Sequence, residues 1–148
     1  MTIENAKIIF KDFSAKGEYS NGRSSFCVAL DEGFAKELIE LGFNIKHNDV
    51  LNTYFLKITI PDTNTRYRPL LSIKNTNTNS YLSWEDVSML DECDIEDAKV
   101  TINIFSWHDL FDGKTHIKAY LDRLEGSICC NLDRKEKKDE SICNDGRI

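Results

Sequence analysis

Two stretches near the C-terminal end of the chain alternate apolar residues with other residues at a period of two. They are "TINIFSW" (101–107) and "THIKAYLDRL" (115–124), joined by a short polar connection. Because successive side chains of a β-strand point to opposite faces of a sheet, this alternation predicts two long strands. Asp112 and Gly113 form a favoured turn dipeptide between them, so the pair is expected to be a β-hairpin in a mainly β fold.

A two-residue turn at Asp112-Gly113 fixes which residues of the hairpin lie opposite each other. The predicted cross-strand pairs are Ile104 with Leu121, Phe105 with Tyr120, Trp107 with Lys118, and Asp109 with His116. Each pair is favourable and contributes about 0.2–1 kcal/mol. This register places an apolar set on one face, namely Ile102, Ile104, Ile117, Ala119 and Leu121.

Shorter stretches before the hairpin predict the rest of the fold. Strands are expected at 6–14, 24–30, 53–60 and 70–74. One main helix is expected over 31–42, with Asp31 as its N-cap and Gly42 at its C-terminal end. A short helix is expected over 83–90, starting at Ser83 in a capping-box-like pattern. These elements predict an OB-like β-barrel with one main helix and one short helix; a half-open β-sandwich is the alternative.

The length of 148 residues favours one folded domain. We expect a single OB-like β-barrel domain over 1–126 and a charged, disordered C-terminal segment over 127–148. No apolar run approaches the roughly 18 residues of a membrane span, and no signal-peptide pattern opens the chain, so a cytoplasmic protein without a membrane partner is expected. The five cysteines are an odd number without a C-x-x-C pair, and they do not predict disulfides or a zinc site.

The second face of the hairpin carries large aromatic rings beside a lysine, and the same parity puts Phe55 and Lys57 on the outer face of their strand. Two arginines follow in the next loop. Exposed rings can stack on bases, at about 1–3 kcal/mol per base, and Lys or Arg neutralises phosphate. This pattern predicts a platform for single-stranded nucleic acid, formed by Phe55, Lys57, Arg66, Arg68, Phe105, Trp107, Lys118 and Tyr120. The alternative is that Phe105 and Trp107 form a second core beneath a helix.

Acidic residues are concentrated in one block between positions 85 and 97, which holds seven of them and no basic residue. Such a block is commonly a solvated surface. Its functional interpretation is a docking surface for a basic protein partner such as a nuclease, formed by Asp91, Glu92, Asp94 and Glu96. The net charge of −6 disfavours tight nonspecific binding to duplex nucleic acid.

The sequence contains none of the common catalytic motifs for nucleotide binding, serine hydrolysis or zinc hydrolysis. In "WHDLFD", Asp109 and Asp112 lie close to His108, which is an arrangement that a metal-dependent nuclease could use. These residues fall at the end of the hairpin, where polar turn residues are expected in any case. No enzymatic activity, catalytic residue, metal site or cofactor is therefore predicted.

The order of several segments resembles a known family. "IENAKIIFKDFSAKGEYSNGRSSFCVALDEGFAKELIELGFNIK", "YFLKITI", "WEDVSMLDECDIEDAKVTINIFSW" and "GKTHIKAYLDRL" are similar to small phage and prophage proteins of replication and recombination regions, described as single-stranded-DNA-binding. The resemblance implies an OB-like fold and a protein that shields single strands inside the bacterial host. It gives the acidic block a second interpretation, as part of a phage-encoded inhibitor of a host defence nuclease. The sequence leaves two further alternatives: a host or phage protein as a partner, and assembly into a homo-oligomer.

Overall fold

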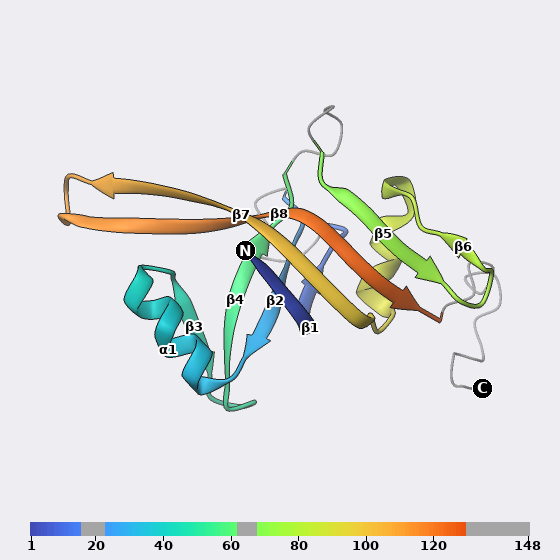
Figure 1. The fold of residues 1–148 in the computed structure, drawn as a ribbon, viewed down its shortest axis with the longest axis horizontal. Coiled ribbons are helices and arrows are strands. Elements are labelled where there is room, and N and C mark those ends of the chain that lie inside the picture. The colour runs from blue at the N-terminus through green and yellow to red at the C-terminus, as the bar shows by residue number, and fades with distance from the viewer. Residues whose placement is uncertain (16–22, 62–67, 130–148) are drawn as a thin grey trace.

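A computed structural model describes residues 1–15, 23–61 and 68–129 of the chain. Within these residues a mainly β fold is observed, in agreement with the sequence (Figure 1). Its elements are, in order, β1 (Thr2–Asp12), β2 (Ser25–Leu30), α1 (Glu32–Leu41), β3 (Ile45–Asn48), β4 (Thr53–Thr59), β5 (Leu70–Asn75), β6 (Ser80–Tyr81), the 3₁₀ helix η1 (Trp84–Glu92), β7 (Glu96–Asp109) and β8 (Lys114–Ile128). The strands β3 and β6 were not expected from the sequence.

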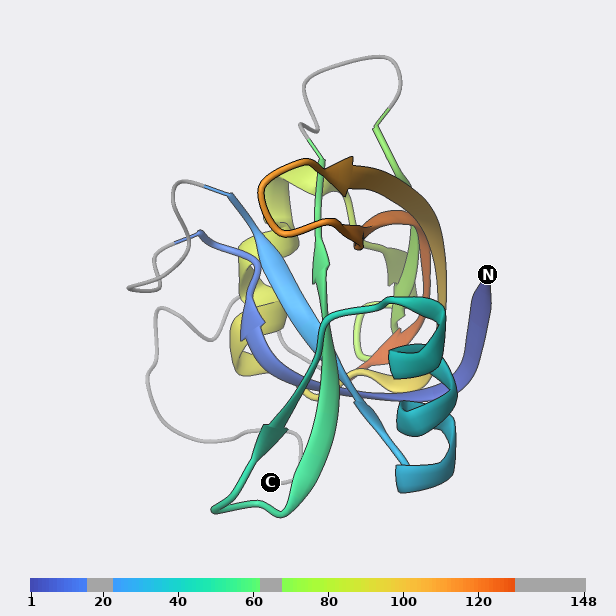
Figure 2. The ribbon, with the colours of Figure 1, turned by 90° about the vertical axis from the view of Figure 1, so that its left-hand side faces the viewer.

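The described strands form one eight-stranded sheet in the order β3-β4-β2-β1-β7-β8-β5-β6. A further parallel pairing joins β4 to β8, with Ile58 opposite Ala119 and Thr59 opposite Tyr120. The pairings of β4, β2, β1, β7 and β8 therefore lead back to β4 and form a ring. Figure 2 looks along the long axis of the molecule and shows these strands arranged around one another.

The core lies on the inner side of this ring. Alternate residues of β2, β4, β7 and β8 point inward because of the period-two geometry of strands. Phe26, Val28, Ile58, Val100 and Leu121 are almost completely buried, at 1% exposure or less. Burying an aliphatic or aromatic side chain of this size stabilises a fold by about 1.5–3 kcal/mol, so this cluster is the main stabilising element.

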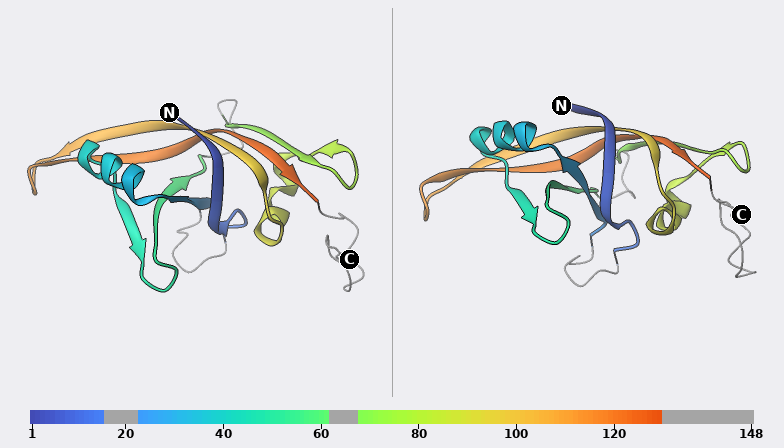
Figure 3. Two further views of the ribbon diagram at one scale, coloured as in Figure 1. Left: turned by 60° about the horizontal axis from the view of Figure 1, so that its bottom comes forward. Right: turned by 90° about the horizontal axis from the view of Figure 1, so that it is seen from below.

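The main helix α1 begins and ends where the sequence predicts. The Asp31 carboxylate accepts a hydrogen bond from the Phe34 N–H at 2.8 Å, which caps the N-terminus. Gly42 ends the helix with a φ of 104°, a left-handed conformation that glycine adopts without strain. The next residue, Phe43, forms a parallel bridge with Ile117 of β8, so the C-terminal end of α1 lies beside the final hairpin (Figure 3).

The predicted short helix is the 3₁₀ helix η1. The expected capping box is absent, because the Ser83 side chain bonds to the Asp86 carboxylate at 3.3 Å and caps no backbone N–H. The helix is anchored by Leu90, which is fully buried. None of the helices among the described residues is long and apolar enough to cross a membrane.

The hairpin of β7 and β8 is present, but its predicted register is wrong by two residues. Phe105 lies opposite Lys118, Trp107 opposite His116, and Asp109 opposite Lys114; Ile104 likewise faces Ala119, not Leu121. The turn spans 110–113, closed by a hydrogen bond from the Gly113 N–H to the Asp109 carbonyl at 2.8 Å. A shift of two residues keeps every side chain on its predicted face, whereas a shift of one would have reversed the faces.

The turn is longer than expected because two aspartates hold its backbone. The Asp109 carboxylate accepts the Phe111 N–H, and the Asp112 carboxylate accepts the Lys114 N–H, both at 2.8 Å. These Asx-type bonds stabilise a four-residue loop in place of the tight two-residue turn.

The distal part of the hairpin, residues 103–118, projects from the ring along the long axis (Figure 1); we call it the hairpin arm. Ile104, expected in the core, is 47% exposed because the arm extends past the packed interior. Leu110 and Phe111 at its tip are also exposed.

At its other end β8 continues to Ile128, which is buried opposite Asn75 of β5. The predicted disordered segment lies outside the described residues from 130 onward. Cys93 is disulfide-bonded, contrary to the expectation from the cysteine count, whereas Cys27 and Cys129 are free thiols.

Candidate nucleic-acid interface

Three rings lie in a row on one face of the hairpin arm. The Phe105 and Trp107 centroids are 5.7 Å apart with 30° between the ring planes, and the Trp107 and His116 centroids are 5.5 Å apart at 26°. Phe105 is 56% exposed and Trp107 is 42% exposed. These side chains are therefore open to solvent, and the interpretation of them as a second core beneath a helix is wrong. Together with Lys118 and Tyr120 they form what we call the aromatic face.

A lysine is positioned among these rings. Lys118 lies opposite Phe105 in the hairpin, and its Nζ is 5.3 Å from the centroid of the Tyr120 ring. Cation–π contact with the tyrosine favours this placement of the ammonium group. The aromatic face thus combines flat, exposed rings with a fixed positive charge.

A groove of about 660 Å³ opens where β4 and β8 separate, beyond the pairing of Ile58 with Ala119. We call it the basic groove, because its lining among the described residues includes three lysines and no aspartate or glutamate. The lysines are Lys57 from β4 and Lys114 and Lys118 from β8. Trp107 lines the same groove, which connects it to the aromatic face. The remaining lining residues are Ile39, Gly42, Phe43, Asn44, Leu56, Thr59, Thr115, His116, Ile117 and Ala119.

The outer face of β4 extends this surface away from the arm. Phe55 lies two residues before Lys57 and opposite Lys46 of β3. The Phe55 ring meets the edge of Phe10 with centroids 5.0 Å apart and 71° between the planes. Phe10 is 45% exposed, so a second aromatic pair with adjacent lysines lies on this part of the sheet.

The structure places five of the eight predicted site residues on the hairpin of β7 and β8 and on the neighbouring strand β4: Lys57, Phe105, Trp107, Lys118 and Tyr120. Phe55 lies farther along β4. Arg68 is exposed, but it lines a separate cavity of about 350 Å³ with Trp84 and Glu85 and does not line the basic groove. Arg66 lies outside the described residues.

Sequence reasoning placed His116 on the face of Phe105 and Trp107 but did not count it among the binding residues, and it did not include Lys114 or Phe10. Extending the period-two parity of Lys118 and His116 back along the strand would have found Lys114. Phe10 gave no such signal, since β1 changes register between Ile9 and Asp12 and Phe10 has a φ of 49°. Its orientation therefore does not follow strand alternation.

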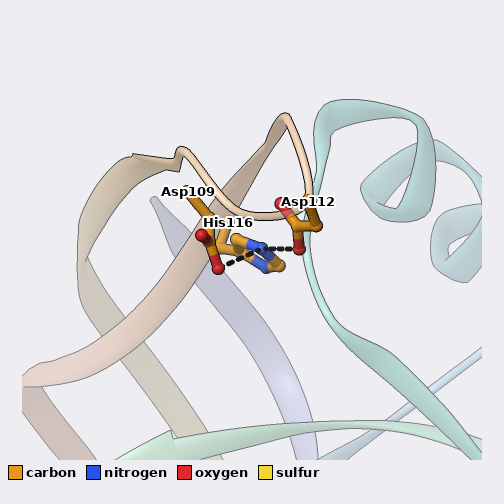
Figure 4. A group of neighbouring side chains, drawn as sticks. All are labelled: Asp109, Asp112 and His116. Carbon is orange, nitrogen blue, oxygen red and sulfur yellow. Dashed lines mark hydrogen bonds and ion pairs between the residues drawn. The ribbon is translucent and has the colours of Figure 1, made fainter.

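Acidic side chains meet a histidine at the turn of the arm (Figure 4). The His116 Nε2 lies 2.8 Å from an Asp112 carboxylate oxygen and 3.9 Å from an Asp109 carboxylate oxygen. The hydrogen bond from the Lys114 N–H, with His116 nearby, lowers the pKa of Asp112. The sequence had placed His108 in this group, but His108 lies opposite Thr115 on the other face of the hairpin.

One member of the acidic block has a structural task. The Asp91 carboxylate accepts hydrogen bonds from the Phe13 N–H at 2.6 Å and the Ser14 N–H at 3.1 Å, which fixes the end of β1. Lys11 of β1 donates a hydrogen bond to the Cys93 carbonyl. Burial lowers the pKa of Lys11, and the charges of Asp94 and Asp91 act in the opposite direction.

The other predicted docking residues, Glu92, Asp94 and Glu96, are exposed at the end of η1 and the start of β7. Figure 1 shows this region away from the hairpin arm along the long axis of the molecule. The acidic block is thus separated from the basic groove, and its negative charge does not line the aromatic face.

No protein-family model and no curated protein sequence matches the chain. Solved structures share its fold. The single-stranded DNA-binding protein of bacteriophage Enc34, in complex with single-stranded DNA, superposes with a TM-score of 0.51 at 14% identity, covering 88% of this chain and 86% of that chain. Its C-terminally truncated form gives a TM-score of 0.50 with the same identity and coverage. The gp2.5 protein of bacteriophage T7, also a single-stranded DNA-binding protein, gives 0.47 at 9% identity, covering 100% and 97%.

The fold of this chain is therefore shared with a bacteriophage single-stranded DNA-binding protein. This likeness agrees with the resemblance seen in the sequence.

Proposed function

We propose that this protein binds single-stranded DNA along the aromatic face and the basic groove, without strong sequence preference. The observation that carries the proposal is the pair of exposed rings, Phe105 and Trp107, beside a groove whose lining, in the part of the chain that the structure describes, has three lysines and no acidic residue. Bases stack on exposed rings whatever their identity, and the lysines neutralise the phosphates between them.

The proposal gives each part of the surface a role. Phe105, Trp107 and Tyr120 stack bases, while Lys57, Lys114 and Lys118 contact phosphates. Phe55, with Phe10 and Lys46, extends the path along the outer face of the sheet. Arg66 and Arg68 are also assigned to phosphate contacts. In this proposal the ring of β1, β2, β4, β7 and β8 is an OB-like barrel, and the single-stranded DNA lies on its outer surface.

The biological role that fits this surface is protection of single-stranded DNA during phage replication or recombination in the cytoplasm of a bacterial host. Such a role needs binding only, and the protein acts without catalysis. The solved neighbours that bind single-stranded DNA support this choice of ligand. The acidic block supports no second function, because Asp91 holds the end of β1 and its neighbours lie away from the groove.

The test is a fluorescence-anisotropy titration of a labelled oligothymidine with the full-length protein, at several salt concentrations. The key variant is Lys57→Gln with Lys118→Gln, and the matched control is Lys36→Gln, which removes an exposed lysine of α1 paired with Glu32 at 2.9 Å. For single strands the slope of log affinity against log salt is about −0.7 per neutralised phosphate. The double variant should therefore flatten the slope by about 1.4, whereas the control should leave it unchanged.

Absence of binding by the wild-type protein at low salt would contradict the proposal. Equal loss of affinity in the double variant and in Lys36→Gln would also contradict it. The binding would then depend on the overall charge of the protein and not on the lysines of the groove.

A further inference from the structure

The turn of the hairpin arm gathers three potential metal ligands from positions that the strand pairing fixes. Asp109 ends β7, Asp112 lies in the turn, and His116 lies in β8 opposite Trp107. One ligand atom from each of the three side chains lies within 4.8 Å of the other two (Figure 4).

The backbone of the turn orients both carboxylates. In each aspartate, Oδ1 accepts a backbone N–H, from Phe111 for Asp109 and from Lys114 for Asp112. The Oδ2 atoms of both point to the same atom, Nε2 of His116, at 3.9 Å and 2.8 Å. Two anionic oxygens and one imidazole nitrogen therefore converge on a single point from three different places in the hairpin.

The surroundings of this point leave the two negative charges only partly balanced. Lys114, opposite Asp109, is the nearest basic residue in the strand pairing, and it also lines the basic groove with Lys118. His108, the other histidine of the arm, lies opposite Thr115 on the other face of the hairpin. Trp107 covers one side of the imidazole, so the ring is held in place while Nε2 stays directed at the carboxylates.

We propose that Asp109, Asp112 and His116 bind one divalent transition-metal ion at the tip of the hairpin arm. A donor set of two carboxylate oxygens and one imidazole nitrogen suits Zn²⁺, Mn²⁺, Co²⁺ and Ni²⁺, and three protein ligands leave further positions for water. The ion takes the place of the proton between Nε2 and the Asp112 carboxylate. With metal–ligand bonds of about 2.1 Å in a tetrahedral arrangement, neighbouring donor atoms lie about 3.4 Å apart, so the Asp109 Oδ2 moves toward Nε2 and the Asp112 Oδ2 moves away from it, each by about 0.5 Å. It links both strands to the turn and fixes the imidazole against Trp107.

The experiment is a titration of the full-length Trp84→Phe variant with Co²⁺ in the absence of DNA, monitored by tryptophan emission. This variant retains Trp107 as its single tryptophan, and an open-shell ion bound to the stacked imidazole quenches its emission. We expect saturable quenching with one ion per chain, reversed by EDTA. Added His116→Gln or Asp112→Asn should each weaken binding at least tenfold, whereas His108→Gln should not change it.

No saturable quenching up to millimolar Co²⁺ would overturn the proposal. Equal quenching in the His116→Gln and His108→Gln variants would also overturn it, because the ion would then be bound elsewhere. The Asp112→Asn variant removes one metal ligand but keeps the imidazole and its contact with Trp107. Weaker quenching in this variant therefore reports loss of the ion and not a change in the stacking of the two rings. The titration contains no DNA, so its failure would leave the proposed function untouched.

Discussion

The indole of Trp107 lies against the imidazole of His116 across the hairpin, with ring centroids 5.5 Å apart and 26° between the planes. Trp107 also approaches Phe105, with ring centroids 5.7 Å apart, so the tryptophan is the ring that contacts both of the others. Trp107 also lines the basic groove, so it is the residue that joins the aromatic face to the groove.

Replacing Trp107 should weaken DNA binding without destabilising the protein. Trp107→Ala removes one stacking surface, worth about 1–3 kcal/mol, which corresponds to an affinity loss of about 5- to 150-fold for oligothymidine. Its melting temperature should stay close to that of the wild type, because the arm projects beyond the core. Anisotropy titration and thermal unfolding followed by circular dichroism measure the two quantities.

Replacing a residue of the inner core should have the opposite profile. Ile58→Ala creates a cavity at a fully buried position of β4 and should lower the free energy of unfolding by about 2–5 kcal/mol in urea. The fraction that remains folded at low temperature should bind oligothymidine with unchanged affinity. A loss of affinity as large as that of Trp107→Ala would show that the binding face depends on the core packing.

Within the acidic block, Asp91 should matter for stability and Glu92 should not. Asp91→Ala leaves the Phe13 and Ser14 N–H groups without their acceptor, which should cost about 1–3 kcal/mol in urea unfolding. The control Glu92→Gln changes an exposed neighbour and should leave the midpoint unchanged. Equal urea-unfolding midpoints for the two variants would contradict the structural role assigned to Asp91.

The free thiol of Cys27 should be unreactive in the folded protein. Burial raises its pKa to about 11, partly offset by Lys57 and Lys46, so very little thiolate is present at pH 8. Iodoacetamide should modify the exposed Cys129 within minutes and Cys27 only after unfolding in urea, as read by peptide mass spectrometry. Comparable labelling of both residues in the folded protein would contradict the buried position of Cys27.

Strand alternation in the sequence predicted which residues share a face, and the structure keeps those faces. It placed Phe105, Trp107, Lys118 and Tyr120 together, because side-chain parity does not depend on the length of the turn. The register of the hairpin, in contrast, depends on the length of the turn. The aspartate side chains of the turn bond to the backbone and lengthen the loop to four residues, which a dipeptide rule does not anticipate.

Features that depend on contacts between distant segments could not be predicted. The basic groove exists because β4 and β8 pair at Ile58 and Ala119 and then separate, a relationship between strands far apart in the chain. The exposure of Ile104 likewise results from the length of the arm relative to the ring, not from local hydrophobicity. Phe10 joins Phe55 only through the irregular register of β1.

The most direct test of the central claim is a titration of the Trp84→Phe variant with oligothymidine, monitored through the emission of Trp107 in metal-free buffer. Stacking of a base on the indole predicts saturable quenching that follows the same isotherm as anisotropy and weakens as salt increases. Binding detected by anisotropy with unchanged Trp107 emission would contradict the account, since the strand would then lie on another surface of the protein.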